Sequence, residues 1–381
     1  MDRRNYSQED VLRLAKRINN QKRSYLLVNP LQAKHMPVSP KASLEMMGSL
    51  GRLVRESCAG VCLVIGFAET ATAIATMVAS ELGDRCFYIQ TTREPLEDVR
   101  TWILFSEEHS HATEQKLCGD RMLGWIAAAD HIIVVDDEFS TGKTLINVAR
   151  SLKAASPEAG KKDFVAASVV NRVDGVHMDL LEEEGYRCVC LVRPKEGNYE
   201  EIVSSLSVHA GEAPETGEED TGRLTVMQLE TDYLNPRRGV LIKEYLEHCR
   251  RIAEEACARL PSFPGNSRVL VLGTEECMFP ALLLGERLET ANQGLCVCCH
   301  ATTRSPIGIS EAEDYPIRNG CQLRSLYEPE RTTYLYNLCA YDLVVLLTDA
   351  PKDLRLPGLR DLQAALRQFA CDRMICLGIG E

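Results

Sequence analysis

The chain has 381 residues, 45% of them hydrophobic, so it is long enough to form two domains with a core each. Its 43 basic and 55 acidic residues give a formal net charge of -12, which argues against a surface adapted to nucleic acid or anionic membranes. The sequence has no apolar run of about 18 residues and no signal-peptide core, and most of its 16 cysteines stand singly in apolar segments, so we expect a cytoplasmic protein with reduced thiols.

The first forty residues predict a helix, a strand and a loop. Ser7 and Asp10 form a capping box at the start of the helix. The apolar face of this helix would consist of Val11, Leu14, Ala15 and Ile18. Residues 24–40 then form a short strand and a proline-punctuated loop, which carries Lys34 and His35. A second helix is expected over about 42–58.

A buried strand over 61–65 ends in a turn of small residues before an alanine-rich helix. The turn consists of Gly66, Phe67, Ala68, Glu69 and Thr70. Because glycine and small side chains let the backbone approach a ligand closely, this turn could bind an anion. The residues alone are equally compatible with an ordinary tight turn between a strand and a helix.

A third strand, over 86–92, leads to Arg93 and then to a long polar segment at 105–116. This segment is too long and too polar for a tight connection, and we expect it to form a mobile lid. It contains His109, His111 and Lys116, which could contact an anion when the lid closes. A solvated loop would also be rich in glutamate and histidine, so both interpretations stay open.

The strongest motif lies at residues 129–152. Four β-formers at 132–135 predict a strand buried on both faces, with Asp136 and Asp137 at its carboxyl end. A loop of small hydroxylated residues then opens an amphipathic helix, where free N–H groups favour an anion. The loop consists of Ser140, Thr141, Gly142, Lys143 and Thr144. The phosphate loop of nucleotide triphosphatases would require glycine at position 137, so a carboxylate pair before an anion loop suits a ribose 5-phosphate better.

Further strands are expected over 164–170 and 187–193. The segment 207–222 is acidic and contains glycine, as is typical of a linker. We therefore predict a first domain over 1–206, a linker over 207–222 and a second domain over 223–381.

The second domain has the sequence pattern of a diverged copy of the first. Strands at 269–273 and 343–347 should be parallel neighbours with a crevice at their carboxyl ends. An intervening strand ends in the second-domain candidates Thr302, Thr303, Arg304 and Ser305. Arg304 could hold a small anion there, although this segment could also be only a turn. Pro351 and its neighbours replace the anion loop, and proline removes an N–H donor.

One dense cluster of soft ligands precedes these candidates, at Cys296, Cys298, Cys299 and His300. Its alternating setting predicts a strand, in which neighbours point to opposite faces. No second cysteine pair completes a zinc site, so we predict no protein-bound metal there.

The segment 129–152 resembles the signature of type I phosphoribosyltransferases. In that family two acidic residues hold the ribose 2- and 3-hydroxyls, and a TGxT loop holds the 5-phosphate. The turn at 66–70 corresponds to the family's pyrophosphate turn, and the segment 105–116 lies where the family carries its flexible catalytic loop. The resemblance implies an α/β fold with a Rossmann-like parallel sheet, followed here by a diverged, related α/β domain.

The sequence TRSP at 303–306 extends the resemblance to nearly the whole chain. A phosphoribosyltransferase domain followed by a TRSP domain is similar to the two-domain phosphoribosyltransferases of bacterial tellurium-resistance and stress-response gene clusters. Members are thought to make a nucleotide-like metabolite, and the resemblance does not name the base.

The implied reaction joins 5-phosphoribosyl 1-pyrophosphate (PRPP) to a nitrogen nucleophile with loss of pyrophosphate, and Mg²⁺ is the implied cofactor. Arg93 could neutralise the pyrophosphate, and Lys34 or His35 could face the base. The alternative is a regulator that binds PRPP without turnover. The sequence leaves open the acceptor and whether the chain forms a homodimer.

Overall fold

The computed structural model describes residues 5–18, 20, 23–106, 115–195, 197–215 and 224–380. The chain forms two compact units. The first unit contains residues 1–8, 45–196 and 234–247, and the second contains 9–44, 197–233 and 248–381. This division differs from the predicted boundaries, because the N-terminal segment 9–44 packs with the second unit rather than the first.

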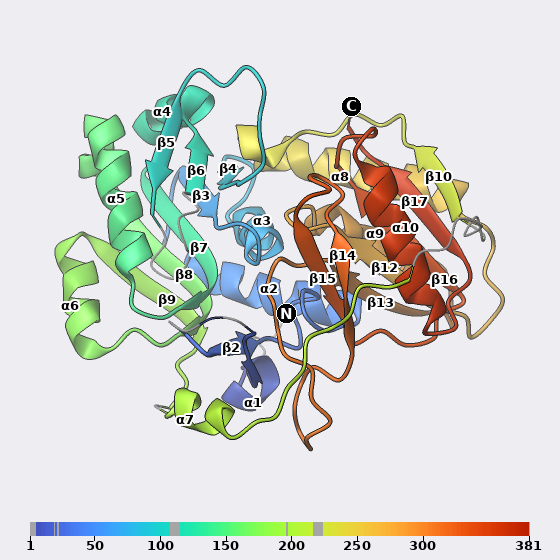
Figure 1. Ribbon diagram of the computed structural model, residues 1–381. Coiled ribbons are helices and arrows are strands. Elements are labelled where there is room, and N and C mark those ends of the chain that lie inside the picture. Colours follow the sequence, from blue (N-terminus) through green and yellow to red (C-terminus); the bar gives the residue numbers. More distant parts are fainter. Residues whose placement is uncertain are drawn as a thin grey trace. The chain divides into compact units, whose positions relative to one another are not determined.

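The first unit is built on a six-stranded sheet in the order β11-β4-β3-β7-β8-β9 (Figure 1). The strands from β4 to β9 pair in parallel, and β11 pairs antiparallel with β4. Residues 132–135 of β7 are all buried, as the sequence predicts for a strand covered on both faces. The strands are β3 Cys62–Gly66, β4 Phe87–Gln90, β7 His131–Phe139, β8 Asp163–Asn171, β9 Tyr186–Val192 and β11 Val240–Leu241.

Helices cover this sheet on both faces, with α4 and α5 on one face and α3 on the other (Figure 1). An antiparallel hairpin, β5–β6, follows β4 in the chain and packs against α5. The remaining elements are α2 Pro40–Arg55, α3 Thr72–Glu81, β5 Trp102–Phe105, β6 Gln115–Cys118, α4 Gly119–Ala128, α5 Lys143–Ala155, η1 Pro157–Lys161, α6 Gly175–Glu183 and η2 Pro236–Arg238.

The second unit has a five-stranded sheet in the order β10-β17-β16-β12-β13, and all of its pairs are parallel. Its strands are β10 Leu224–Gln228, β12 Arg268–Gly273, β13 Cys296–Ala301, β16 Leu343–Thr348 and β17 Met374–Gly378. Its other elements are α7 Tyr199–Ser204, α8 Ile242–Arg259, α9 Phe279–Ala291, β14 Gly320–Arg324, β15 Thr332–Tyr336 and α10 Arg355–Arg367. Helix α8 begins in the first unit and continues into the second.

The two sheets repeat one topology. The order β4-β3-β7-β8 in the first unit corresponds to β13-β12-β16-β17 in the second. Each unit also inserts an antiparallel hairpin between its second and third strands, β5–β6 in one and β14–β15 in the other. The predicted parallel pairing of 269–273 with 343–347 is confirmed, with Leu272 opposite Leu346 as Ile65 is opposite Val134. The second unit is thus a diverged copy of the first in strand order and register.

The N-terminal helix is shorter than predicted. Helix α1 spans only Gln8–Val11, and Arg13–Lys16 forms β1, which pairs antiparallel with β2, Tyr25–Val28. Ala15 lies opposite Leu26 and is fully buried. The prediction of a helix continuing to Ile18 is wrong, because strand pairing outweighs the weak helical preference of so short a segment.

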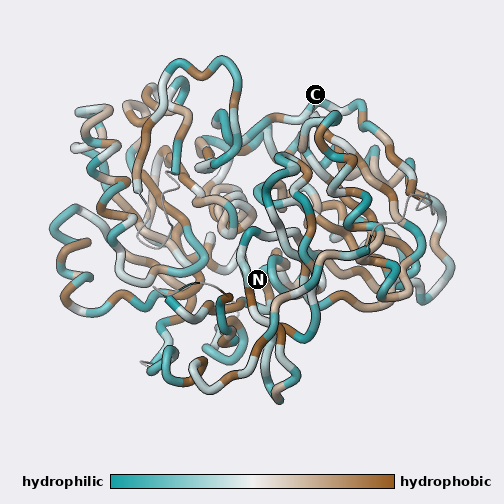
Figure 2. Tube along the Cα trace, viewed as in Figure 1, coloured by the Kyte–Doolittle hydropathy of each residue, from teal (hydrophilic) through white to brown (hydrophobic). Residues whose placement is uncertain are grey.

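Hydrophobic residues concentrate along the strands of each sheet (Figure 2), where they form a separate core in each unit. Every cysteine is a free thiol. None of the helices in the described part of the chain is both long and apolar enough to cross a membrane.

Two matched glycines end the first strand of each copy and allow close packing. A Cβ on Gly66 would lie 2.4 Å from Ala75 Cβ, and one on Gly273 would lie 2.5 Å from the Cys277 carbonyl oxygen. We expect Gly66→Ala and Gly273→Ala each to lower the free energy of unfolding by roughly 1–3 kcal/mol. Urea denaturation, followed by the fluorescence of each unit's aromatic residues, measures this change.

The control is Gly124→Ala, in the exposed middle of α4, where an added Cβ would meet nothing within 4 Å. This change should stabilise the protein by about 0.5–1 kcal/mol, because alanine is the better helix former. If Gly66→Ala or Gly273→Ala also stabilised the protein, the close packing at these strand ends would be contradicted.

Candidate functional site

The candidate site lies at a topological switch point of the first unit's sheet. Strand β3 is central, and the chain continues from it to β4 on one side, while β7 pairs with its other side. Turns that follow two such strands diverge, which leaves a crevice at the carboxyl ends of the strands. The turn after β3 and the loop after β7 both lie at this crevice, as the sequence predicts.

The turn after β3 is held by backbone hydrogen bonds. Phe67 N donates to the Val135 carbonyl at 3.0 Å, which ties the turn to the neighbouring strand β7. Ala68 N donates to Thr91 Oγ1 at 2.8 Å, and Gln115 Nε2 donates to the Ala68 carbonyl at 2.9 Å. The Ala68–Glu69 peptide bond is cis. These contacts fix the backbone of the turn in one conformation at the edge of the crevice.

The carboxylate pair belongs to the end of β7, which extends to Phe139. Asp136 and Asp137 are partly buried, and Asp136 Oδ1 accepts the N–H of Asp137 at 2.9 Å. Asp137 Oδ1 accepts a hydrogen bond of 3.0 Å from Thr70 Oγ1. This bond joins the two turns across the switch point, so the structure brings the predicted acidic pair and the predicted β3 turn together.

The predicted anion loop leads directly into α5. Gly142 is the N-terminal cap of this helix and has a φ of 74°, a left-handed conformation that favours glycine. A Cβ there would also lie 2.8 Å from Leu181 Cδ1. Since glycine has no side chain to cap the helix, backbone N–H groups of the first turn face the loop. Lys143 is exposed, and its N–H donates to Thr141 Oγ1 at 3.4 Å.

The predicted lid lies partly outside the described residues. Its ends are β5 and β6, whereas residues 107–114, with His109 and His111, are not described. Lys116 lies in β6 with its ammonium 4.8 Å from the centre of the Trp102 ring, and its carbonyl accepts the N–H of Thr92 at 3.0 Å. Arg93 follows β4 and is partly buried at the same edge of the sheet.

Lys34 and His35 lie in the second unit, although the sequence suggested contact with the base in the first. Both side chains are buried, and Lys34 Nζ donates to the carbonyls of Glu275 at 2.7 Å and Thr302 at 2.9 Å. The positive charge of Lys34 therefore stabilises the carboxyl edge of the second sheet. Contact of Lys34 or His35 with a base stays a prediction from the sequence.

Sequence reasoning did not single out Asn171, the last residue of β8. It lies opposite Phe139 of β7 and is only 2% exposed. Its Oδ1 accepts the N–H of Val173 at 2.9 Å, while its Nδ2 has no hydrogen-bond partner within the described part of the chain. A polar residue at the end of a largely apolar strand, beside the acidic strand, was the signal available in the sequence.

The corresponding edge of the second unit repeats the backbone contacts of the first. Glu275 N donates to Thr302 Oγ1 at 3.1 Å, as Ala68 N does to Thr91 Oγ1. Thr303 N donates to the Tyr334 carbonyl at 2.9 Å, and its Oγ1 accepts the N–H of Ser305 at 3.2 Å. The predicted second-domain residues thus meet at one place in the fold.

Arg304 does not face an open anion site. Its Nε lies 2.5 Å from Glu275 Oε2, and its Nη2 lies 3.6 Å from Glu276 Oε1. Glu275 also pairs with Arg331 at 3.0 Å and accepts a 2.5 Å hydrogen bond from Ser325 Oγ. Neighbouring carboxylates therefore already balance the charge of Arg304. These contacts do not support the expectation that Arg304 binds a small anion.

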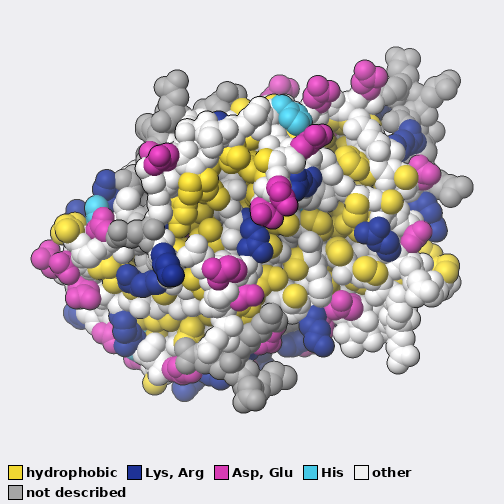
Figure 3. Space-filling model, turned by 90° about the horizontal axis from the view of Figure 1, so that it is seen from below, with side chains coloured by type: hydrophobic (Ala, Val, Ile, Leu, Met, Phe, Trp, Pro, Cys, Tyr) yellow, Lys and Arg dark blue, Asp and Glu magenta, His cyan; other side chains and the backbone are white. Residues whose placement is uncertain are grey.

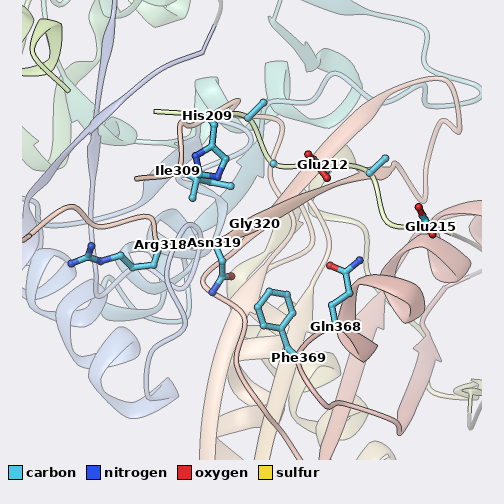
Figure 4. A pocket seen from close by; sticks show the side chains of 12 residues that line it. His209, Glu212, Glu215, Ile309, Arg318, Asn319, Gly320, Gln368 and Phe369 are labelled. Atoms are coloured by element: carbon cyan, nitrogen blue, oxygen red, sulfur yellow. The ribbon is translucent and has the colours of Figure 1, made fainter. Parts of the chain in front are cut away.

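A groove of about 380 Å³ lies elsewhere in the second unit (Figure 4). Glu212 and Glu215 lie along one wall, Gln368 and Phe369 lie on the other, and Arg318 points away from them (Figure 4). The segment 209–215 is part of the predicted linker, and it forms bridges with Ile309 and Cys321 instead of running free. The charged side chains do not converge, so the groove carries no site.

No group of three or more metal-ligating side chains occurs within the residues that the structure describes. The strand predicted at the cysteine and histidine cluster is confirmed as β13. His300 Nδ1 accepts the N–H of Ala301, and Nε2 donates to the Tyr336 carbonyl at 2.7 Å, so the ring is neutral. Burial lowers the pKa of His300 to about 4.

Two family models match the chain, one after the other along the sequence. Residues 11–193 match the family model described as "Phosphoribosyl transferase", and residues 235–366 match the one described as "TRSP domain C terminus to PRTase_2". The chain contains a phosphoribosyltransferase domain followed by a TRSP domain. No curated protein matches the sequence.

Solved structures similar to this chain include adenine phosphoribosyltransferases. The enzyme of Giardia lamblia, complexed with 9-deazaadenine, has 13% identity and a TM-score of 0.35, and the match covers 49% of this chain and 94% of that one. The Trypanosoma brucei enzyme, in complex with AMP, pyrophosphate and ribose-5-phosphate, has 14% identity and a TM-score of 0.35, with 49% and 77% covered.

Neutral, buried His300 makes the stability of the second unit depend on pH. The unfolded chain binds a proton below a pKa of about 6.5, whereas the folded chain resists protonation until about 4. The free energy of unfolding should therefore be highest above about pH 6.5. It should fall by roughly 3 kcal/mol as the pH drops to about 4. Urea denaturation across this range measures the change.

His300→Gln should flatten this dependence, because glutamine does not titrate. His209→Gln, at an exposed position, is the control and should leave the slope unchanged. An equal slope in wild type and His300→Gln would contradict the assignment.

Proposed function

We propose that the first unit binds PRPP and transfers its phosphoribosyl group to a nitrogen nucleophile, releasing pyrophosphate and forming a nucleotide-like product. The observation that carries this proposal is the hydrogen bond of 3.0 Å between Thr70 and Asp137. It joins the turn after β3 to the carboxylates and, through them, to the anion loop. PRPP carries a diphosphate, two ribose hydroxyls and a 5-phosphate in this same order.

The carboxylates are suited to the ribose and the loop to the 5-phosphate. Asp136 and Asp137 provide charged acceptors for the two hydroxyl donors, and charge-assisted hydrogen bonds of this kind are strong. The N-terminus of α5 offers N–H groups beside a left-handed Gly142, a geometry that favours phosphate. The hydroxyls of Ser140, Thr141 and Thr144 complete this part of the site.

The pyrophosphate would lie against the turn 66–70, with Arg93 as its positive partner. Departure of pyrophosphate leaves an oxocarbenium-like sugar, so catalysis depends on stabilising the leaving group and excluding water. Asp136 and Asp137 would lie near the cationic sugar and stabilise it. Lys116, in β6, would act on the same leaving group.

Mg²⁺ is compatible with this site. The ion is commonly held by one or two carboxylates together with substrate phosphates and water, so it needs no preassembled protein cluster. Asp136 and Asp137 supply hard oxygen ligands at a partly buried strand end. When bound, the metal would neutralise charge on the pyrophosphate.

Asn171 is our candidate for recognising the acceptor. Its Oδ1 is occupied by Val173, which directs the amide and leaves Nδ2 to donate to a ligand. A buried donor without a partner is costly, and a ligand oxygen or nitrogen would remove this cost. We therefore propose an acceptor with a hydrogen-bond acceptor atom near its nucleophilic nitrogen.

The surface charges bear on the class of acceptor, and the thiols bear on the location of the protein. Lysine and arginine side chains on the face in Figure 3 are interspersed with acidic ones rather than gathered in a stripe. This distribution and the net charge of -12 support a small-molecule acceptor over nucleic acid. Free thiols support a cytoplasmic location. A role in tellurium resistance or stress response rests on the sequence resemblance alone.

Removing the two carboxylate charges tests PRPP binding. Asp136→Asn with Asp137→Asn should weaken binding by about 1.5–3 kcal/mol for each lost charge-assisted hydrogen bond. Isothermal titration calorimetry with PRPP and Mg²⁺ measures the loss. Asp179→Asn, on the exposed side of α6, is the control and should bind like wild type. Unchanged affinity in the double variant would refute the ribose assignment.

Asn171→Asp tests whether the side chain of Asn171 recognises the acceptor. Aspartate keeps an oxygen for the Val173 N–H but removes the Nδ2 donor, so the acceptor KM should rise at least about fivefold while PRPP affinity changes little. Steady-state kinetics with varied acceptor measures this split. Asn198→Asp, which keeps its own helix-capping oxygen in α7, is the matched control. A similar acceptor KM in the Asn171 and Asn198 variants would exclude Asn171 from recognition.

A further inference from the structure

The second unit keeps a basic residue at the position of the anion-loop lysine. Lys143 lies six positions after Asp137, and Arg355 lies six positions after Asp349, the residue that follows β16. Each of these basic residues begins a helix of 13 residues, α5 in the first unit and α10 in the second. The spacing from the aspartate to the helix is therefore equal, although β7 continues to Phe139 and β16 ends at Thr348.

The surroundings of Arg355 differ from those of Lys143. Lys143 is exposed, whereas Arg355 is only 2% exposed. The Arg355 side chain folds back into the loop, where Nε donates to the Ala350 carbonyl at 2.5 Å and Nη1 donates to Gln228 Oε1 at 3.3 Å. Its Nη2 has no hydrogen-bond partner among the residues that the structure describes.

The guanidinium group lies across the carboxyl ends of three strands. Gly378 ends β17 and pairs with Thr348 of β16 and with Gln228 of β10. A Cβ on Gly378 would come within 2.1 Å of Arg355 Nη1, so glycine provides the space for the guanidinium. This is the edge of a parallel sheet at which ligands bind.

Arg355 also differs from three other arginines of the second unit. Arg304 and Arg331 pair with Glu275, and Arg324 pairs with Asp361 at 2.6 Å. No carboxylate in the described part of the chain pairs with Arg355. A buried guanidinium without a negative partner is unfavourable in the folded protein unless an anion binds to it.

We propose that the loop between β16 and α10 is a phosphate-binding site of the second unit, with Arg355 as its cation. The guanidinium fork matches the geometry of phosphate oxygens, and the N-terminus of α10 favours negative charge beside it. Pro351 leaves this loop one N–H donor fewer, so Arg355 would supply most of the contacts. No side chain caps this helix end. Inorganic phosphate and the phosphate of a sugar ester share this chemistry.

Hydrogen exchange of the full chain, read by mass spectrometry, tests the site. Exchange is compared in chloride and in inorganic phosphate at equal ionic strength, over peptides that cover 349–358 and 374–380. At a phosphate concentration of about ten times the dissociation constant, hydrogen exchange in these peptides should slow about tenfold. A second series with ribose 5-phosphate identifies the better source of the phosphate group.

Arg355→Met is the decisive variant, because it removes the charge and keeps the length of the side chain. It should lose the phosphate-dependent protection without lowering the melting temperature in chloride. Arg360→Met, at an exposed position of α10, is the matched control and should keep the protection. Protection in the Arg355 variant equal to that in the control would overturn the proposal. So would a lower melting temperature in chloride, which indicates a purely structural arginine.

Hydrogen exchange of the wild-type protein also tests the site by itself, so the test does not depend on whether a variant folds. No protection at 349–358 in saturating phosphate would overturn the second site. The peptide covering 136–146 reports the first unit's anion loop in the same experiment. Protection there alone refutes this inference and leaves the proposed function intact, whereas protection at 349–358 alone supports the inference and counts against the first loop.

Discussion

The parallel pairing of β3 with β7 is the constraint on which the rest of the first unit depends. It places the turn after Gly66 beside the carboxylates that end β7, and the bond from Thr70 to Asp137 then fixes their spacing. Because β4 lies on the other side of β3, the two turns separate and leave room for a ligand. The anion loop, helix α5 and the end of β8 all take their positions from this pair of strands.

The second unit uses the same pairing for a different result. Its β12 and β16 are parallel neighbours, and the contacts of Thr302 and Thr303 repeat those of Thr91 and Thr92. Where the first unit has Ala68, however, the second has Glu275, which binds two arginines. The duplicated backbone was therefore kept, while the side chains at its carboxyl edge came to balance one another's charge.

Local patterns predicted the parts of the fold that depend on local physics. The apolar runs at 61–65 and 132–135 fix buried strands, and the order of motifs fixes the switch point. The sequence does not show where distant segments pack, so the short α1 and the burial of Lys34 in the second unit were not foreseen. The sequence did not single out Asn171 or Arg355, because each is an ordinary polar residue there. Only the fold buries them and leaves one donor of each without a partner among the described residues.

The most direct test of this account is whether the purified protein consumes PRPP. The measurement is mass spectrometry of PRPP, pyrophosphate and new phosphoribosyl products in a screen of bases and small amides with Mg²⁺. We expect one acceptor class to give a phosphoribosyl product with one pyrophosphate per PRPP consumed, and the Asp136 and Asp137 double variant to give none. PRPP binding without turnover across the screen would contradict the proposed enzyme and favour a PRPP-binding regulator.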